Sequence, residues 1–429
     1  MGKTGRITGG RPVDLGGHVH HITDDAETRP AIRRPRTAVV AALGFSMVLL
    51  AACSSSSDDG GGDGTTTTTV PAVEPVDFSG PGPYEVGTTT IDMGDRVAYV
   101  FYPADAAATA EAEVVDGYSS AVAFPEAVRA VMPEQFVQDI PLDAYRDVAP
   151  SPDGPFPVII HSHGFGGYAA YASQHFEHMA SWGFVTASPE HVERDLAASA
   201  LGTVERGADV EVLRATYAEL EEADAGGLLA GSMDLDQLAV EGHSAGGSAV
   251  MSFAADPEVK TVIGQAPGPG VDVDPEAPDR EAALTAAYAD ATPPDKPSMI
   301  LAGEVDATIP LTSVDLLFDW LAPPKRYAVL AAAGHNAFTD LCAPIRAQGG
   351  LTQFAGTLPV PDQLLELGED GCTEGDLEPE LGYRIIDHLT VAQLRDVFGI
   401  DAEVAAASLE QAWLEELFPG ALARYEYVP

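Results

Sequence analysis

One short motif constrains the fold more than any other feature of this chain. An apolar run at 238–241 is typical of a buried strand, and it leads directly into Gly242-His243-Ser244-Ala245-Gly246. Residues 248–255 follow with the spacing of a helix. A turn from a strand straight into a helix is so tight that the residues two positions either side of its centre must lack bulk, as glycine does. We therefore expect Ser244 to stand out at the carboxyl edge of a sheet as a nucleophile; the alternative is a glycine-rich turn with a solvated serine.

The chain after residue 77 alternates apolar runs with helical segments. Strands regularly separated by helices predict an α/β protein, a mostly parallel doubly wound sheet with helices on both faces. No repeat or second domain is visible, so residues 77–429 are predicted to form one domain, with an irregular insertion at 105–150. The predicted strands are 96–102, 157–161, 184–187, 238–241, 261–263, 298–301 and 327–330, and the predicted helices include 171–182, 206–223 and 248–255.

A glycine-rich loop, residues 161–167, directly follows the predicted strand 157–160. A loop in this place can supply one backbone donor to a developing oxyanion, and the residue after the nucleophile supplies the other. We expect these donors to be the N–H groups of Phe165 and Ala245; the alternative is a glycine-rich turn without a ligand. His161 and His163 lie two apart like metal ligands, but no third ligand is near in sequence, so we expect no metal and no cofactor.

Two further loops carry residues that can complete a catalytic triad. His335 follows the predicted strand 327–330 and is the expected general base for Ser244. Asp306 follows the strand 298–301 and is expected to orient His335, with Glu304 as the nearby alternative. The order Ser, Asp, His along the chain is the one found in α/β-hydrolases. His388 is the alternative base, although it begins an amphipathic segment, and His243 is expected to pack beneath the turn.

The N-terminus reads as an export signal. Arginines at 33, 34 and 36 precede an apolar run at 37–50, which ends in Leu50-Ala51-Ala52-Cys53. This ending resembles the lipobox of bacterial lipoproteins, which implies removal of residues 1–52 and a lipid on Cys53. Residues 53–76 are rich in Ser, Gly and Thr and are predicted to be a flexible tether. The alternative is a short buried helix, and the exporter, Sec or twin-arginine, stays open.

Charge and cysteine content limit the partners. With 22 Lys and Arg against 66 Asp and Glu, the net charge is −44, which argues against nucleic acid as a partner and against adsorption to an anionic membrane. No apolar run reaches the ~20 residues of a membrane-spanning helix, so we expect membrane contact only through the lipid. We also expect the protein to be a monomer. Cys342 and Cys372, in an exported chain, predict a disulfide rather than two buried thiols.

The chain resembles the bacterial relatives of plasma-type platelet-activating-factor acetylhydrolase, among the dienelactone-hydrolase-like and cutinase-like α/β-hydrolases. The resemblance runs over about 260 residues, from Gly82 to Leu341, and is carried by several short stretches together. It implies a lidless, calcium-independent serine esterase acting on short or oxidised acyl esters, either small molecules or lipids. The matching stretches are Gly82-Pro83-Tyr84-Glu85-Val86-Gly87, Phe101-Tyr102-Pro103, 157–164, 179–185, Glu190-His191, Arg194-Asp195 and 334–338.

The chain departs from the acetylhydrolases at Gly264-Gln265-Ala266-Pro267-Gly268, where that family carries its acid. The acid is therefore assigned to Asp306, one strand later, as in cutinase-like polyesterases. Phe165, Tyr168 and Trp182 are the predicted lining of an apolar acyl pocket. The alternatives are a cutinase-like polyesterase or lipase, a serine peptidase, and a non-catalytic envelope-binding lipoprotein.

Overall fold

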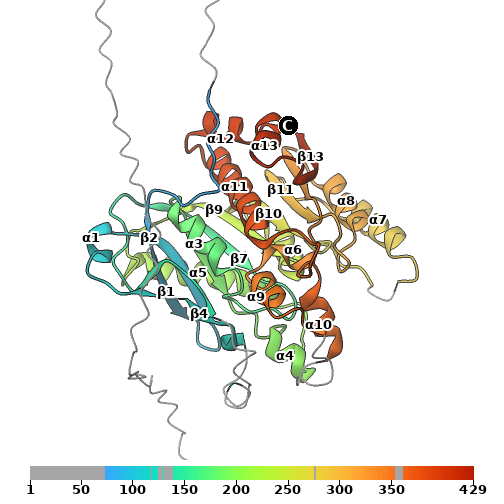
Figure 1. Ribbon diagram of the computed structural model, residues 1–429, viewed down its shortest axis with the longest axis horizontal. Coiled ribbons are helices and arrows are strands. Elements are labelled where there is room, and N and C mark those ends of the chain that lie inside the picture. The colour runs from blue at the N-terminus through green and yellow to red at the C-terminus, as the bar shows by residue number, and fades with distance from the viewer. Residues whose placement is uncertain (1–72, 116, 124–128, 130–138, 275–276, 353–360) are drawn as a thin grey trace, which may run out of the picture. The chain divides into compact units, whose positions relative to one another are not determined.

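The computed structural model describes residues 73–115, 117–123, 129, 139–274, 277–352 and 361–429 (Figure 1). All of them belong to one compact unit, Val70–Pro429. The predicted signal at 1–52, Cys53, and the tether up to residue 72 lie outside the described residues. Within the described ranges, no helix combines the length and the apolar character needed to cross a bilayer.

The described part of the chain is built on one large mixed sheet. Its order is β13-β12-β11-β10-β9-β7-β8-β2-β1-β6-β3, and the strands from β8 to β12 run parallel. This arrangement confirms the predicted α/β-hydrolase fold, and every predicted strand overlaps a strand of the sheet. The strands are β1 (Glu85–Asp92), β2 (Val97–Ala104), β3 (Val114–Val115), β6 (Ala144–Arg146), β7 (Phe156–Ser162), β8 (Val185–Pro189), β9 (Met233–His243), β10 (Val259–Gln265), β11 (Ser298–Gly303), β12 (Lys325–Leu330) and β13 (Leu422–Val428).

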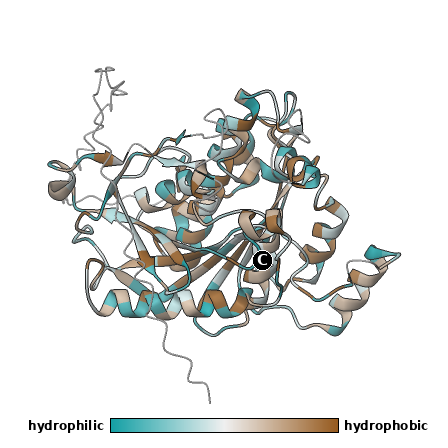
Figure 2. Cartoon of the chain, turned by 90° about the horizontal axis from the view of Figure 1, so that it is seen from below, coloured by the Kyte–Doolittle hydropathy of each residue, from teal (hydrophilic) through white to brown (hydrophobic). Residues whose placement is uncertain are grey.

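Helices cover both faces of this sheet because its central strands are apolar on both sides. In β7, Val158 and Ile160 face one core while Ile159 faces the other, and all three are buried. Figure 2 shows hydrophobic residues in the central strands, while the helices mix hydrophobic and hydrophilic residues. One face carries α5 (Asp209–Ala225), α6 (Ala245–Phe253), α7 (Arg280–Asp290) and α8 (Leu311–Trp320); the other carries α3 (Ser173–Ser181), α11 (Pro379–Phe398) and α13 (Gln411–Leu417), with α12 (Ala402–Ser408) against α11.

The insertion at 105–150 is more regular than predicted. In its described part, β6 pairs in parallel with β1 and extends the sheet beyond the first strand. Strands of two or three residues carry no periodicity, which is why the pattern of residues did not reveal them. The insertion also holds α1 (Ala106–Thr109), η1 (Ser120–Ala123), and a separate two-stranded sheet of β4 (Tyr118–Ser119) and β5 (Asp139–Ile140).

Four short elements lie near the carboxyl ends of the parallel strands. They are α4 (Leu196–Leu201), η3 (His335–Phe338), α9 (Cys342–Ala347) and α10 (Asp362–Glu369). A disulfide joins Cys342, at the start of α9, to Cys372, just after α10, as predicted. Helix α10 contacts η3, so the disulfide-closed segment lies against the loop that carries His335.

Candidate active site

Ser244 lies in the turn between β9 and α6, as the motif predicts. Its φ of 57° is in the left-handed region that non-glycine residues rarely adopt, a strain that is common at functional sites. A Cβ on Gly242 would lie 2.4 Å from the Gly246 carbonyl oxygen, and a Cβ on Gly246 would lie 1.9 Å from that of Ser162. Neither position accepts a larger residue, so the two glycines are what allows the backbone to hold Ser244 in this turn.

The structure brings Ser244, His335 and Asp306 together from three separate loops. His335 Nε2 lies 2.8 Å from Ser244 Oγ, and His335 Nδ1 lies 2.9 Å from Asp306 Oδ2. The other oxygen, Asp306 Oδ1, accepts from the N–H groups of Thr308 and Ile309 at 2.8 and 2.7 Å. A carboxylate held in this way keeps the imidazole oriented with Nε2 directed at the serine, as in a Ser-His-Asp triad.

The rival acid and the rival base lie elsewhere. Glu304 is exposed, and it accepts a hydrogen bond from the N–H of Ala332 rather than from His335. His388 is buried in α11, where it accepts from the Phe78 N–H and donates to the Ser408 carbonyl. Both ring nitrogens of His388 are thus hydrogen-bonded to backbone groups, and neither is bonded to Ser244 or Asp306.

The loop that follows β7 lies against the turn of Ser244. A Cβ on Gly164 would lie 3.1 Å from Ser244 Cβ, a tight contact, so the loop passes close to the nucleophile turn. The Gly164 N–H is used, since it donates to Tyr171 Oη at 2.8 Å. For the N–H groups of Phe165 and Ala245, the described residues provide no hydrogen-bond partner. These two donors flank the serine and are the ones the sequence predicts for an oxyanion.

His243 packs beneath the turn, as expected, and also connects two loops. Its Nε2 lies 2.9 Å from the His335 carbonyl and its Nδ1 lies 2.8 Å from Tyr171 Oη. A carbonyl can only accept, so Nε2 carries the proton and Nδ1 accepts from the tyrosine. Burial lowers the pKa of His243 well below its usual value, and the nearby His335 lowers it further, which keeps the ring neutral as this arrangement requires.

A cavity of about 50 Å³ opens on Ser244 and His335. Helix α10, which was not predicted, forms part of its wall, and none of the residues of the 105–150 insertion that the structure describes lines it. Nothing in the sequence indicated that α10 would lie beside Ser244, because its approach depends on a disulfide-closed loop. The apolar side chains in the lining are Phe165, Tyr171, Leu196, Leu341, Leu364 and Leu367.

Two predicted pocket residues do not line this cavity. Trp182 caps the C-terminal end of α3 just before β8, so it lies at the opposite edge of the sheet, where it packs on Phe78 and donates to the Gly80 carbonyl. Tyr168 is buried between the rings of Tyr118 and Tyr171 and lines a separate cavity beside β2. Only Phe165 of the predicted three lies at the serine.

A second Ser-His-Asp arrangement lies behind the same loop. Ser162 Oγ is 2.9 Å from His191 Nε2, and His191 Nδ1 is 3.3 Å from Asp209 Oδ1. Ser162 and His191 are completely buried, and Arg194 donates to the serine hydroxyl at 3.1 Å. A substrate cannot reach this serine, so triad-like distances here serve packing rather than catalysis.

The glycine-rich loop at 161–167, which we call the oxyanion loop after its predicted role, contains two histidines that have partners other than a metal. His161 Nδ1 lies 3.3 Å from the buried Glu241 Oε2, and His163 Nε2 lies 2.9 Å from Glu190 Oε1. Within the ranges that the structure covers, no three His, Cys, Asp or Glu side chains are grouped to hold a metal ion.

One comparison with known proteins bears on this site. The family model described as platelet-activating factor acetylhydrolase, isoform II, matches residues 77–225. No curated protein matches the chain. The matched segment includes the oxyanion loop and ends before Ser244, Asp306 and His335, and it indicates hydrolase activity on esters. With this match and its strand order, the chain has an α/β-hydrolase fold and resembles platelet-activating factor acetylhydrolase over residues 77–225.

Proposed function

We propose that the protein is a serine esterase that works through an acyl-enzyme on Ser244. The observation that carries this proposal is the chain of short contacts from Asp306 through His335 to Ser244, 2.9 and 2.8 Å long. The same serine opens on a cavity, and two backbone N–H groups beside it have no other partner among the described residues. A nucleophile, a base, an orienting acid and two donors are the parts that acyl transfer needs.

Each part has one step in the proposed reaction. Ser244 Oγ attacks the ester carbonyl carbon while His335 Nε2 accepts the serine proton. The oxyanion that forms accepts from the N–H groups of Phe165 and Ala245. His335 then gives its proton to the departing alkoxide, which leaves as an alcohol. Water, deprotonated by the same imidazole, cleaves the acyl-enzyme, and the carboxylic acid is released.

The size of the cavity supports a short acyl group. The cavity beside Ser244 measures only about 50 Å³, and a space of this size favours a short acyl group. Its wall is apolar, as an alkyl chain requires, and Phe165 is partly exposed at the mouth. We therefore propose short-chain or lipid-derived esters as substrates, with longer chains excluded by Leu364 and Leu367.

The test is kcat/KM of the purified protein on p-nitrophenyl esters from acetate to dodecanoate. Acetate and butyrate are expected to be the best substrates, and Ser244→Ala should lose at least about 10³-fold in kcat while its circular dichroism spectrum stays unchanged. Ser252→Ala, an exposed serine on the same helix, is the matched control. Turnover by Ser244→Ala within tenfold of wild type would refute the assignment.

We also propose that the enzyme is exported and anchored by a lipid on Cys53. The support is the sequence alone: a basic cluster, an apolar run and Leu50-Ala51-Ala52-Cys53. Cys53→Ser should move the protein from the membrane pellet to the soluble fraction and abolish incorporation of radiolabelled palmitate. Ser54→Ala, next in sequence, should change neither, and a pelleted Cys53→Ser protein would contradict the proposal.

A further inference from the structure

We propose that Asp370 is a positioning residue that holds the loop of Asp306 and the loop of His335 at the spacing catalysis requires. The inference rests on the proposed function, because it concerns the same triad. Asp370 follows α10 and lies 35 residues beyond His335 in the sequence. It belongs neither to the triad nor to the strands that carry the triad.

One oxygen of Asp370 binds the acid loop. Asp370 Oδ2 accepts from the Thr308 hydroxyl at 2.7 Å and from the Ala307 N–H at 3.1 Å. Thr308 in turn donates its own N–H to Asp306 Oδ1 at 2.8 Å. Asp370 thus restrains the residue that restrains the catalytic carboxylate.

The other side of Asp370 binds the histidine loop. Asp370 Oδ1 accepts from the His335 N–H at 3.3 Å, and the Asp370 carbonyl accepts from the Asn336 N–H at 2.9 Å. The two loops follow neighbouring strands, β11 and β12, so their bases are already fixed by the sheet. The sheet does not fix the distance between the tips of the two loops. A single carboxylate that is hydrogen-bonded to both tips can fix this distance.

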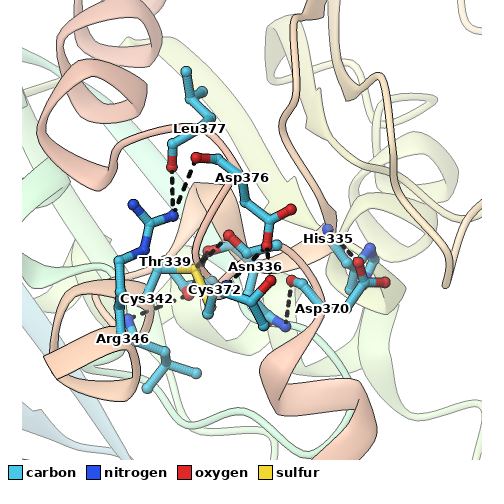
Figure 3. Close-up of a disulfide and its surroundings, with 12 residues drawn as sticks. His335, Asn336, Thr339, Cys342, Arg346, Asp370, Cys372, Asp376 and Leu377 are labelled. Carbon is cyan, nitrogen blue, oxygen red and sulfur yellow. Dashed lines mark hydrogen bonds between the residues drawn. A yellow bond between two sulfur atoms is a disulfide. The ribbon is translucent and has the colours of Figure 1, made fainter. Parts of the chain in front are cut away.

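The disulfide keeps Asp370 in place (Figure 3). Cys372, two residues on, is bonded to Cys342, which follows the η3 segment of His335. Gly371 packs so closely on the His335 loop that a Cβ on Gly334 would lie 2.4 Å from Gly371 Cα. Backbone contact and a covalent bond therefore restrain the segment that carries Asp370.

Misplacing a base by about 1 Å can cost on the order of 10²-fold in rate, whereas substrate binding depends on the cavity walls. Asp370→Ala should therefore lower kcat by about 10- to 100-fold and leave KM within about twofold. Asp370→Asn keeps one acceptor oxygen and should fall between alanine and wild type. Asp376→Asn is the matched control: this nearby carboxylate accepts from the Thr373 N–H and hydroxyl and touches neither triad loop.

The experiment measures kcat, KM and the second-order rate of Ser244 labelling by a fluorophosphonate, with the melting temperature of each variant. Labelling needs only the activated serine, so it is independent of which ester is the substrate. Slower labelling in Asp370→Ala and a smaller loss in Asp370→Asn support the positioning role. Thr308→Val should reproduce part of the loss, and the double variant should lose less than the product of the two single losses.

Two outcomes separate this inference from the proposed function. If wild-type Ser244 is not labelled, the proposed nucleophile is wrong. If wild type and Asp370→Ala are labelled at the same rate with the same kcat, the enzyme is a serine hydrolase and the positioning role is wrong. A drop in melting temperature without any change in labelling also overturns the inference, because it assigns Asp370 to stability alone.

Discussion

His243 Nε2 donates a hydrogen bond to the backbone carbonyl of His335, 2.9 Å away. The residue before the nucleophile is therefore bonded to the residue that activates it. Through Tyr171 the same ring is connected to the Gly164 N–H in the oxyanion loop. One neutral imidazole thus links three loops that converge on Ser244.

This link predicts a catalytic effect for the hydroxyl group of Tyr171. Tyr171→Phe removes the acceptor of the Gly164 N–H and the donor to His243, so two buried groups lose their partner, at about 1–3 kcal/mol each. We expect kcat for p-nitrophenyl acetate to fall by about 3- to 30-fold as the oxyanion loop loosens. Tyr168→Phe, three residues earlier and without contact to Gly164 or His243, should leave kcat unchanged, and equal rates in both variants would contradict the link.

The choice between two neighbouring carboxylates gives a second prediction. Asp306→Asn removes the negative charge that orients His335 and should lower kcat by about 10³–10⁴-fold, as expected when a triad loses its acid. Glu304→Gln, which alters an exposed side chain bonded only to the Ala332 N–H among the described residues, should stay within about twofold of wild type. Steady-state measurement of kcat for the two variants tests the assignment. A larger loss in Glu304→Gln than in Asp306→Asn would assign the acid of the triad to Glu304.

The sheet and the turn of Ser244 could be predicted from local patterns, while the walls of the site could not. Apolar runs and the glycines at 242 and 246 act over a few residues, so they are visible in the chain itself. Asp370 and Leu364 approach the site from a loop closed by a disulfide, and nothing near them in sequence points to a triad. Trp182 was placed wrongly although the predicted elements locate it: it ends the predicted helix 171–182 just before the predicted strand 184–187, and a helix that leads into a parallel strand ends at the amino edge of the sheet, away from Ser244.

The wall formed by α10 predicts a change in substrate preference. Leu364 lies next to the oxyanion loop, where its Cδ2 would be 3.5 Å from a Cβ on Gly166. Leu364→Ala should enlarge the cavity and raise kcat/KM for hexanoate relative to acetate by about fivefold or more. Leu201→Ala, an exposed leucine of α4 outside the cavity, is the control. An unchanged chain-length profile in Leu364→Ala would show that α10 does not limit the acyl chain.

The disulfide predicts a joint loss of stability and rate. Opening the loop between Cys342 and Cys372, which are 30 residues apart, should cost about 3–4 kcal/mol of unfolding free energy in the loop-entropy model. Cys342→Ser with Cys372→Ser, followed by urea denaturation, measures this cost. If the disulfide also holds Asp370, the same variant should label more slowly with a fluorophosphonate under conditions where it is fully folded. Reducing agent should reproduce the effect in wild type and change nothing in the double variant.

A buried carboxyl group outside the triad predicts how stability varies with pH. Asp340 accepts from the hydroxyls of Tyr118 and Tyr383 and from the Gln174 N–H, and burial raises its pKa to about 7. The unfolded chain releases this proton near pH 3.9, so between about pH 4 and 7 the folded protein binds more protons and its stability falls as pH rises. Asp340→Asn cannot ionise, so its melting temperature relative to wild type should rise from pH 4.5 to pH 8 and then level off. Asp290→Asn, which changes an exposed carboxylate of α7, is the control and should show no such trend. If the melting temperatures of Asp340→Asn and wild type change with pH in parallel, Asp340 is already ionised in the folded protein at low pH.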